Sequence, residues 1–342
     1  YIMVTLDALS AIFVLMLALL SYVGNMHLGI LLMIQGFVAF FYGFFDPATK
    51  GMIPQLVGPD KLTKTNAKVA TLRILSQLVA PLVAVALYTR YGITLLFLIN
   101  GISFLLSALS ESLIKYHHVA KESKQGIKGV FHDMKEGMVF IKNSLLIRRL
   151  SLFFLLVFAL IQPVISVILP LFYRTKLNYS DTLYGYLQVV LVAGALIGSI
   201  AVGLSAKNGK IKDPFTSGVL IMSLGFIGFV AMMFPPIVKW LGNDSLLYLI
   251  GFCFMMLVMY TAIMFVTIPL QTIIQRKTPP EYMSRVFSIV GVISKGGMPL
   301  GALIYGLVLD AIPIHVTGMI ASMLVFFISL NFTSKMRKME DF

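Results

Sequence analysis

Long apolar runs separated by short polar segments repeat along the entire chain. Ten runs have 18 to 24 residues each, and they are Ile2–Val23, Leu28–Phe45, Ala67–Tyr88, Ile93–Leu113, Leu150–Tyr173, Thr182–Leu204, Phe215–Phe234, Leu246–Ile268, Val286–Leu309 and Ile314–Phe332. Because roughly 20 apolar residues in a helix cross the hydrocarbon core of a bilayer, each run is long enough to span a membrane. Most of the intervening polar turns are short, so we expect consecutive helices to be antiparallel neighbours.

The composition supports an all-α membrane protein and excludes several other classes. Hydrophobic residues make up 58% of the chain and charged residues 12%, whereas about a quarter of a soluble domain is charged. The net charge of +13 comes from Lys and Arg in short segments between apolar runs, which indicates membrane topology rather than nucleic-acid binding. The single Cys253 lies within an apolar run, and no nucleophile–base pair or phosphate-binding loop stands out. We therefore expect no enzyme activity, no cofactor, no metal and no nucleic-acid partner.

The cations are concentrated in alternate polar segments. If Tyr1 starts on the inner side, the inner segments hold 22 of the 27 Lys and Arg residues, the outer segments hold four, and Lys295 falls within a span. Cytosolic segments of membrane proteins are enriched in Lys and Arg. The distribution therefore predicts that both termini are cytosolic.

One long polar interval, residues 115–149, divides the chain. It carries eight cations and three acids, with four apolar runs before it and six after it. We therefore expect an incomplete N-terminal bundle over residues 1–114, a cytosolic basic linker over 115–149 and a six-helix C-terminal bundle over 150–342. Apolar residues of the linker recur at three- and four-residue steps, as in an amphipathic helix: Ile127, Val130, Phe131, Met134, Met138 and Ile141. Such a helix is expected either on the inner membrane surface or against the cytosolic face of the protein itself.

A Pro–acid pair recurs at corresponding places in the two halves. Pro59-Asp60 follows the second run, and Pro280-Glu281 follows the eighth, six runs later. Pro and an acid suit the first turn of any helix, so the recurrence carries more weight than the pair itself. Parallel six-helix repeats characterise one transporter architecture, and by this offset the first bundle lacks its first two helices.

Several short motifs resemble one branch of a known family. The branch is the bacterial efflux branch of the major facilitator superfamily, which contains macrolide-efflux and enterobactin-exporter-like proteins. The motifs resemble the segment joining its fourth and fifth helices, its sixth helix and its seventh and eighth helices, and they are Asp46-Pro47-Ala48, Ile53-Pro54, Asp60-Lys61-Leu62, Asn66-Ala67, Ser103-Phe104-Leu105-Leu106, Leu169-Pro170, Tyr184-Gly185-Tyr186 and Gly194-Ala195-Leu196-Ile197-Gly198. The resemblance covers nearly the whole chain.

The resemblance implies a fold, a location and a function. The ten spans would be helices 3 to 12 of a twelve-helix transporter in the bacterial cell membrane. The protein would export small amphiphilic compounds, drug-like, macrolide or siderophore-like, by proton antiport and alternating access. The antiporter-associated Gly-Pro signature of helix 5 survives only as Ala80-Pro81. Two other functions stay open, namely a truncated chain that transports nothing and an importer of the same fold.

The family's substrate cavity is lined mainly by helices 1, 4, 7 and 10, of which three are present. Their matching faces carry aromatic, Met and amide side chains, which suit a bulky and mostly apolar ligand. These candidate residues are Gln35, Tyr42, Phe158, Gln162, Ser166, Tyr260, Met264, Thr267 and Gln271. Helix packing is the alternative role for each of them.

Three charged residues within or at the ends of spans are candidates for coupling or gating. An ionisable group inside a span is costly unless it faces a polar cavity or a partner, so Lys295 is expected to face the cavity. Arg73 lies some seven residues in from Asn66, and extension to the inner surface or pairing with Asp46 or Asp60 is the competing explanation. Asp46 occupies a helix end, where a structural cap or gating pair is the competing explanation. Structural ion pairing or extension towards the interface is the alternative for Lys295.

Overall fold

The computed structural model describes residues 2–114, 127–206 and 212–338, and all regular structure within these ranges is helical. The helices in chain order are α1 (Ile2–Tyr22), α2 (Leu28–Leu56), α3 (Leu62–Ser112), α4 (Ile127–Asn143), α5 (Leu145–Pro163), α6 (Leu169–Phe172), α7 (Asp181–Ser205), α8 (Lys212–Ala231), α9 (Pro235–Leu241), α10 (Leu246–Lys277), α11 (Met283–Leu309) and α12 (Ile314–Arg337). Short 3₁₀ and π-helical segments join some of them.

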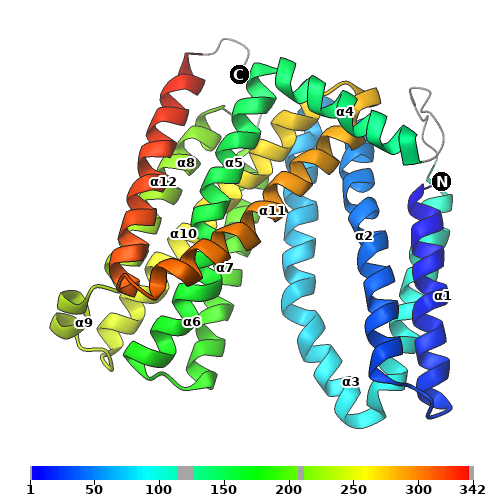
Figure 1. Ribbon diagram of the computed structural model, residues 1–342, viewed down its shortest axis with the longest axis horizontal. Coiled ribbons are helices and arrows are strands. Elements are labelled where there is room, and N and C mark those ends of the chain that lie inside the picture. The colour runs from blue at the N-terminus through cyan, green and yellow to red at the C-terminus, as the bar shows by residue number, and fades with distance from the viewer. Residues whose placement is uncertain (1, 115–126, 207–211, 339–342) are drawn as a thin grey trace. The chain divides into compact units, whose positions relative to one another are not determined.

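Nine helical segments of the described residues are long and apolar enough to cross a membrane. The sequence predicts ten spans, and the difference lies in α3, which contains two of them. Its backbone leaves the helical region at Gly92, where φ is 76° and ψ is 179°. Figure 1 shows the ribbon of α3 reversing direction. Because a positive φ costs glycine little, Gly92 permits this reversal within a nearly continuous helical segment.

The chain divides into two compact units whose limits cut through helices. Unit 1 contains Tyr1–Gly58, Ser76–Gly137 and Thr278–Ser288, and unit 2 contains Pro59–Leu75, Met138–Lys277 and Ile289–Phe342. The first turns of α3 therefore belong with the C-terminal helices, and the first turns of α11 belong with the N-terminal helices. The sequence prediction of bundles over 1–114 and 150–342 does not anticipate these exchanges.

Unit 1 is built on the packing of α1 against α2 and the second arm of α3. Its apolar core contains Val14, Leu17, Ala18, Ile34 and Phe97. The hydroxyl groups of Ser21 and Thr94 form a hydrogen bond of 2.7 Å at one end of this core. Many apolar side chains outside it are exposed, as expected where lipid rather than water is the solvent.

Unit 2 is centred on α10, which packs against α7 and α8, while α12 packs against α8 and α5. Glycines bring α7 close to α10, because a Cβ added at Gly198 would lie 2.5 Å from the Thr261 carbonyl oxygen. The Thr261 hydroxyl donates a hydrogen bond of 3.0 Å to the Gly194 carbonyl. Small residues at helix contacts allow this close approach within a bilayer.

Both Pro–acid pairs begin a 3₁₀ turn that leads directly into a long helix. The turn Pro59–Lys61 precedes α3, and the turn Pro280–Tyr282 precedes α11. Proline suits such a start because the first N–H groups of a helix have no partner within it. The correspondence predicted from the sequence is therefore confirmed at the level of local structure.

The apolar span that starts at α5 contains two π-helical segments, Val164–Ile168 and Tyr173–Leu177. Pro163 directly precedes the first of them and removes a backbone donor, which leaves the Ala159 carbonyl without its usual intrahelical partner. Gly301 of α11 packs closely over that carbonyl. The Tyr305 hydroxyl donates a hydrogen bond of 2.8 Å to the next carbonyl, that of Leu160. Gly301 and Tyr305 of α11 thus contact the carbonyls at the start of the π-helical segment.

The helix predicted within the basic linker is present as α4. Gly137 and Ile141 are buried, whereas Met134 and Met138 are exposed. The first part of the linker, residues 115–126, lies outside the described residues. α4 contacts the rest of unit 1, since its acids Asp133 and Glu136 pair with Arg285 of α11.

Candidate functional site

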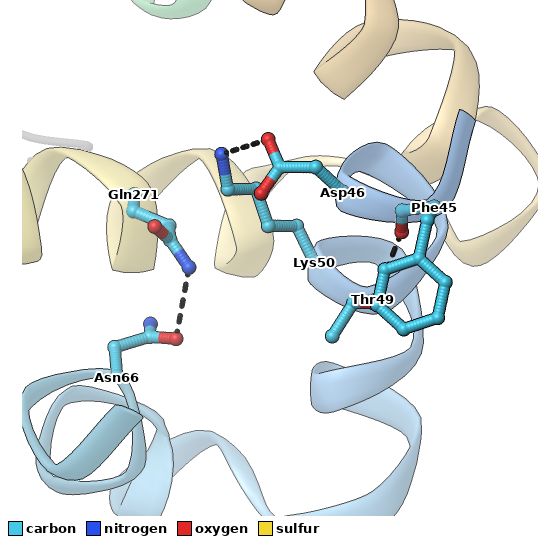
Figure 2. Close-up of polar contacts among 6 residues, drawn as sticks. All are labelled: Phe45, Asp46, Thr49, Lys50, Asn66 and Gln271. Carbon is cyan, nitrogen blue, oxygen red and sulfur yellow. Dashed lines mark hydrogen bonds and ion pairs between the residues drawn. The ribbon is translucent and has the colours of Figure 1, made fainter. Parts of the chain in front are cut away.

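A cluster of buried neutral polar side chains joins the first turns of α3 to the last turns of α10 within unit 2. Asn66 donates hydrogen bonds of 2.9 Å to the Thr272 hydroxyl and 2.6 Å to Gln275 Oε1. Gln271 Nε2 donates a hydrogen bond of 3.1 Å to Asn66 Oδ1, which Figure 2 shows. Both N–H groups and the oxygen of the Asn66 amide are therefore satisfied. We call Asn66, Gln271, Thr272 and Gln275 the amide cluster.

Three of the four side chains in the amide cluster are buried. The exposed fractions of Asn66, Thr272 and Gln275 are 3%, 0% and 2%. Thr272 in turn donates a hydrogen bond of 3.0 Å to the Ile268 carbonyl. Because an unsatisfied polar group in such a place costs about 1–3 kcal/mol, the cluster is stable only while its members stay together.

Two further contacts within unit 2 join the start of α3 to α7 and the turn before α3 to α10. The hydroxyl groups of Thr71 and Ser199 lie 2.9 Å apart. The Arg276 guanidinium donates a hydrogen bond of 2.7 Å to the Pro59 carbonyl. The contact surface therefore combines hydroxyls and amides with an apolar cluster of Ala67, Val202 and Ile268.

A charged cluster in unit 1 attaches the linker helix α4 to the first turns of α11. Arg285 contacts the Asp133 carboxylate at 2.8 Å and the Glu136 carboxylate at 2.6 Å. The Arg285 side chain is 12% exposed and the two acids are 24% and 26% exposed. His132 lies 3.4 Å from the other oxygen of Glu136. We call Arg285, Asp133 and Glu136 the Arg285 cluster.

Asp46, a predicted gating residue, lies in the second half of α2. Its exposed fraction is 7%. Its carboxylate forms an ion pair of 2.9 Å with Lys50 one turn later, as Figure 2 shows. Pro47 follows within the same helix. The structure thus places Asp46 as a buried, paired carboxylate.

The other two predicted charges are placed differently. Arg73 is exposed on α3 and belongs to unit 2. Lys295 belongs to α11, and its side chain lies outside the described part of the structure.

The predicted cavity residues of α2 and α5 are accessible. Gln35 and Tyr42 are exposed on α2 in unit 1. On α5 and the π-helical segment after it, Phe158 and Gln162 are half-buried and Ser166 is exposed. Phe158 stacks on Phe154 with ring centroids 4.1 Å apart.

Three of the four predicted cavity residues of α10 contact other helices. The Cβ atoms of Tyr260 and Met264 lie over Gly194 and Gly198 of α7. The Thr267 hydroxyl points to the Met264 sulfur at 4.0 Å. Gln271 belongs to the amide cluster. All four side chains remain partly accessible.

Comparison with known proteins identifies the family. The sequence profile of the Major Facilitator Superfamily matches residues 1–302. The chain belongs to the Major Facilitator Superfamily. It is therefore a multi-pass membrane transporter that acts on small molecules, not an enzyme.

Curated members of the superfamily similar to this chain include efflux proteins. The chain is 24% identical to Macrolide efflux protein A of Streptococcus pyogenes over 84% of its own length and 68% of that protein. It is also 24% identical to the Multidrug efflux pump Tap of Mycolicibacterium fortuitum, over 98% of its own length and 79% of that protein.

Solved structures of other superfamily transporters share the fold. The human organic anion transporter MFSD10 (TETRAN) aligns with a TM-score of 0.72 at 14% identity, covering 96% of this chain and 77% of that one. A bacterial homologue of the iron transporter ferroportin in the outward-facing state aligns with a TM-score of 0.68 at 16% identity, covering 97% and 83%.

The sequence interpretation identifies Gln271 but misses the group to which it belongs. A usable signal is the spacing of Gln271 and Gln275, which places two amides on one face of α10. Nothing in the sequence pairs this face with Asn66, because the partner lies more than two hundred residues away. Likewise, nothing in the sequence pairs Arg285 with Asp133 and Glu136 on α4.

Proposed function

We propose that the protein exports small amphiphilic compounds, drug-like, macrolide or siderophore-like, by proton antiport and alternating access. The proposed direction of transport and the proposed substrate class rest on the similarity to named efflux pumps over 84% and 98% of the chain. The orientation that we propose places the cation-rich ends of the helices, and both termini, in the cytosol.

The amide cluster supports alternating access because its chemistry suits a contact that breaks and re-forms. Four neutral side chains carry it, and a neutral amide that leaves its partners can exchange them for water at modest net cost. We propose that the amide cluster holds α3 against α10 while the cytosolic side is closed. Opening would expose it to water.

The residues proposed to contact the substrate are the accessible candidates of each unit, on α2 in unit 1 and on α5, the segment after it and α10 in unit 2. Tyr42, Phe158, Tyr260 and Met264 would supply apolar and polarizable surface, and Gln35, Gln162, Ser166, Thr267 and Gln271 would supply hydrogen bonds. This mixture suits a ligand that is mostly apolar and carries a few polar groups. Lys295 and Arg73 are proposed to contact acidic groups of the substrate or of the protein.

Proton coupling is proposed to involve Asp46. The carboxylate is buried and is balanced by Lys50 at 2.9 Å. A proton on Asp46 would neutralise it and weaken this pair, so substrate-linked protonation would change the end of α2. A carboxylate within a membrane segment is a common position for proton transfer.

Transport into inverted membrane vesicles tests the proposal. With an acidic lumen, we expect vesicles that contain the protein to accumulate a labelled macrolide, and accumulation should stop when the pH gradient is collapsed. Asp46→Asn should remove the dependence on the gradient. Asp244→Asn, which changes an exposed loop carboxylate, is the matched control and should transport normally.

Two results would reject parts of this function. Loss of preloaded compound from inverted vesicles under the same gradient would indicate import. Gradient-dependent uptake that persists in Asp46→Asn would remove Asp46 from proton coupling and leave export itself intact.

A further inference from the structure

A groove with a volume of about 360 Å³ runs between the first turns of α3 and the last turns of α7, entirely within unit 2. Its floor is narrow because the two helices approach closely. A Cβ added at Gly203 would lie 3.2 Å from the Cβ of Ala67. Beside this contact, the hydroxyls of Thr71 and Ser199 meet at 2.9 Å. The groove therefore lies along the contact between α3 and α7, and the Gly203–Ala67 and Thr71–Ser199 contacts hold the two helices together.

The walls of the groove are apolar and face outward. Leu72 on α3 is 65% exposed and Leu204 on α7 is 71% exposed. In a membrane protein, leucine side chains so exposed are expected to be in contact with lipid. The groove thus offers an apolar, outward-facing surface between α3 and α7.

The polar end of the groove carries two cations. Lys64 and Lys68 line it, both are exposed, and they lie one turn apart on the same face of α3. Neither lysine belongs to an ion pair with a carboxylate among the described residues. Their positive charge therefore remains available to a ligand.

We propose that this groove binds one anionic glycerophospholipid of the cytosolic leaflet. Its phosphate would contact Lys64 and Lys68, and the first part of an acyl chain would lie between Leu72 and Leu204. An apolar channel with charge at one end matches an amphiphile, and basic pockets between helices on the cytoplasmic side are suited to anionic head groups. The proposal rests on the orientation given under the proposed function, which places these lysines at the cytosolic leaflet.

Lipid binding would strengthen the contact between α3 and α7. The acyl chain would cover the Thr71–Ser199 hydrogen bond from the membrane side and contact both helices. Because a ligand that binds only the folded state stabilises it, phosphatidylglycerol should raise the unfolding temperature of the detergent-solubilised protein. The effect should saturate at one lipid per chain.

The test is titration of the purified full chain in detergent with phosphatidylglycerol, read by native mass spectrometry and by thermal unfolding. Phosphatidylcholine with the same acyl chains and glycerol 3-phosphate are the comparison ligands. The double variant Lys64→Ala/Lys68→Ala should lower the affinity for phosphatidylglycerol about 30-fold, since each cation near an anionic head group contributes about fivefold. Lys64→Arg/Lys68→Arg should retain binding.

Leu204→Trp, which changes an exposed residue of the groove wall, should fill the groove and lower the affinity for phosphatidylglycerol without loss of charge.

The matched control is Lys335→Ala/Lys338→Ala, which removes two exposed lysines near the end of α12. Equal losses in both double variants would indicate a diffuse charge effect and overturn the proposal. Equal binding of phosphatidylcholine, or equal stabilisation by glycerol 3-phosphate, would also overturn it. These measurements do not depend on transport activity. Lipid binding can therefore be tested even if the protein does not export the proposed compounds.

Discussion

The amide cluster and the Arg285 cluster occupy similar places and use different chemistry. Each contains a residue in the first turns of the helix that follows a Pro–acid 3₁₀ turn, Asn66 after Pro59–Lys61 and Arg285 after Pro280–Tyr282. Asn66 is 3% exposed, and its side-chain hydrogen bonds to Gln271, Thr272 and Gln275 join neutral groups. Arg285 contacts two carboxylates that are each about one quarter exposed, at 24% and 26%.

The difference follows from desolvation. Burying a charge without water costs several kcal/mol, and the attraction of a partner often fails to offset it. A fully buried contact that must re-form is therefore better made from amides. A contact that keeps access to water can use charges, and it gains specificity from the fork geometry of arginine. Variants at these two places should separate the two chemistries.

The largest effect is expected for Asn66→Asp. The substitution keeps the size of the side chain but places a carboxylate beside Gln275 Oε1, which now accepts a hydrogen bond of 2.6 Å. An uncompensated buried charge lowers stability by about 3–5 kcal/mol, so the unfolding temperature in detergent should fall sharply and export should be lost. Asn331→Asp, at an exposed site of α12, is the control. A stable, active Asn66→Asp protein would show that water reaches the amide cluster.

An intermediate effect is expected for Arg285→Ala. It removes the guanidinium that joins Asp133 and Glu136, and the loss of these charged hydrogen bonds should lower the free energy of unfolding by about 2 kcal/mol. Thermal unfolding in 0.15 M and 1 M salt checks the cause, because the screening length falls from about 8 Å to about 3 Å. The difference from the unmodified protein should shrink at high salt. A difference in unfolding temperature that does not change with salt would assign Arg285 a packing role. The destabilisation by Asn66→Asp should depend less on salt than the destabilisation by Arg285→Ala.

The smallest effect is expected for Thr71→Val. Ser199 retains a bond of 2.9 Å to the Leu196 carbonyl when the Thr71 hydroxyl is removed. Hydrogen bonds between membrane helices average about 0.6 kcal/mol, so a double-mutant cycle with Ser199→Ala should give a coupling energy of about that size. A coupling above about 2 kcal/mol would place this pair on a level with the Arg285 cluster.

The helices follow from the sequence because hydrophobic length alone specifies them in a bilayer. The sequence predicts the ten spans, and two of them are joined at Gly92 within α3. It also predicts α4 and both Pro–acid turns. Local composition is sufficient for these features, since a membrane helix satisfies its own backbone.

The contacts between helices do not follow from the sequence in the same way. Asn66 and Gln271 are both visible as polar residues near helix ends, yet nothing local indicates that they meet. The assignment of residues 59–75 to unit 2 likewise depends on tertiary packing rather than on hydropathy. The roles predicted for Tyr260, Met264 and Lys295 concern substrate binding, and they stay predictions.

The two π-helical segments have a consequence for how the fifth span tolerates changes in length. A π turn holds one residue more than the α turn it replaces, so every side chain beyond Ile168 is rotated relative to a regular helix. Deleting a single residue between Val164 and Ile168 would remove this extra residue, so a regular helix would keep Phe172 and Tyr173, both buried, on the same face. This span should therefore tolerate a one-residue deletion within the π turn far better than a deletion in its regular α-helical turns.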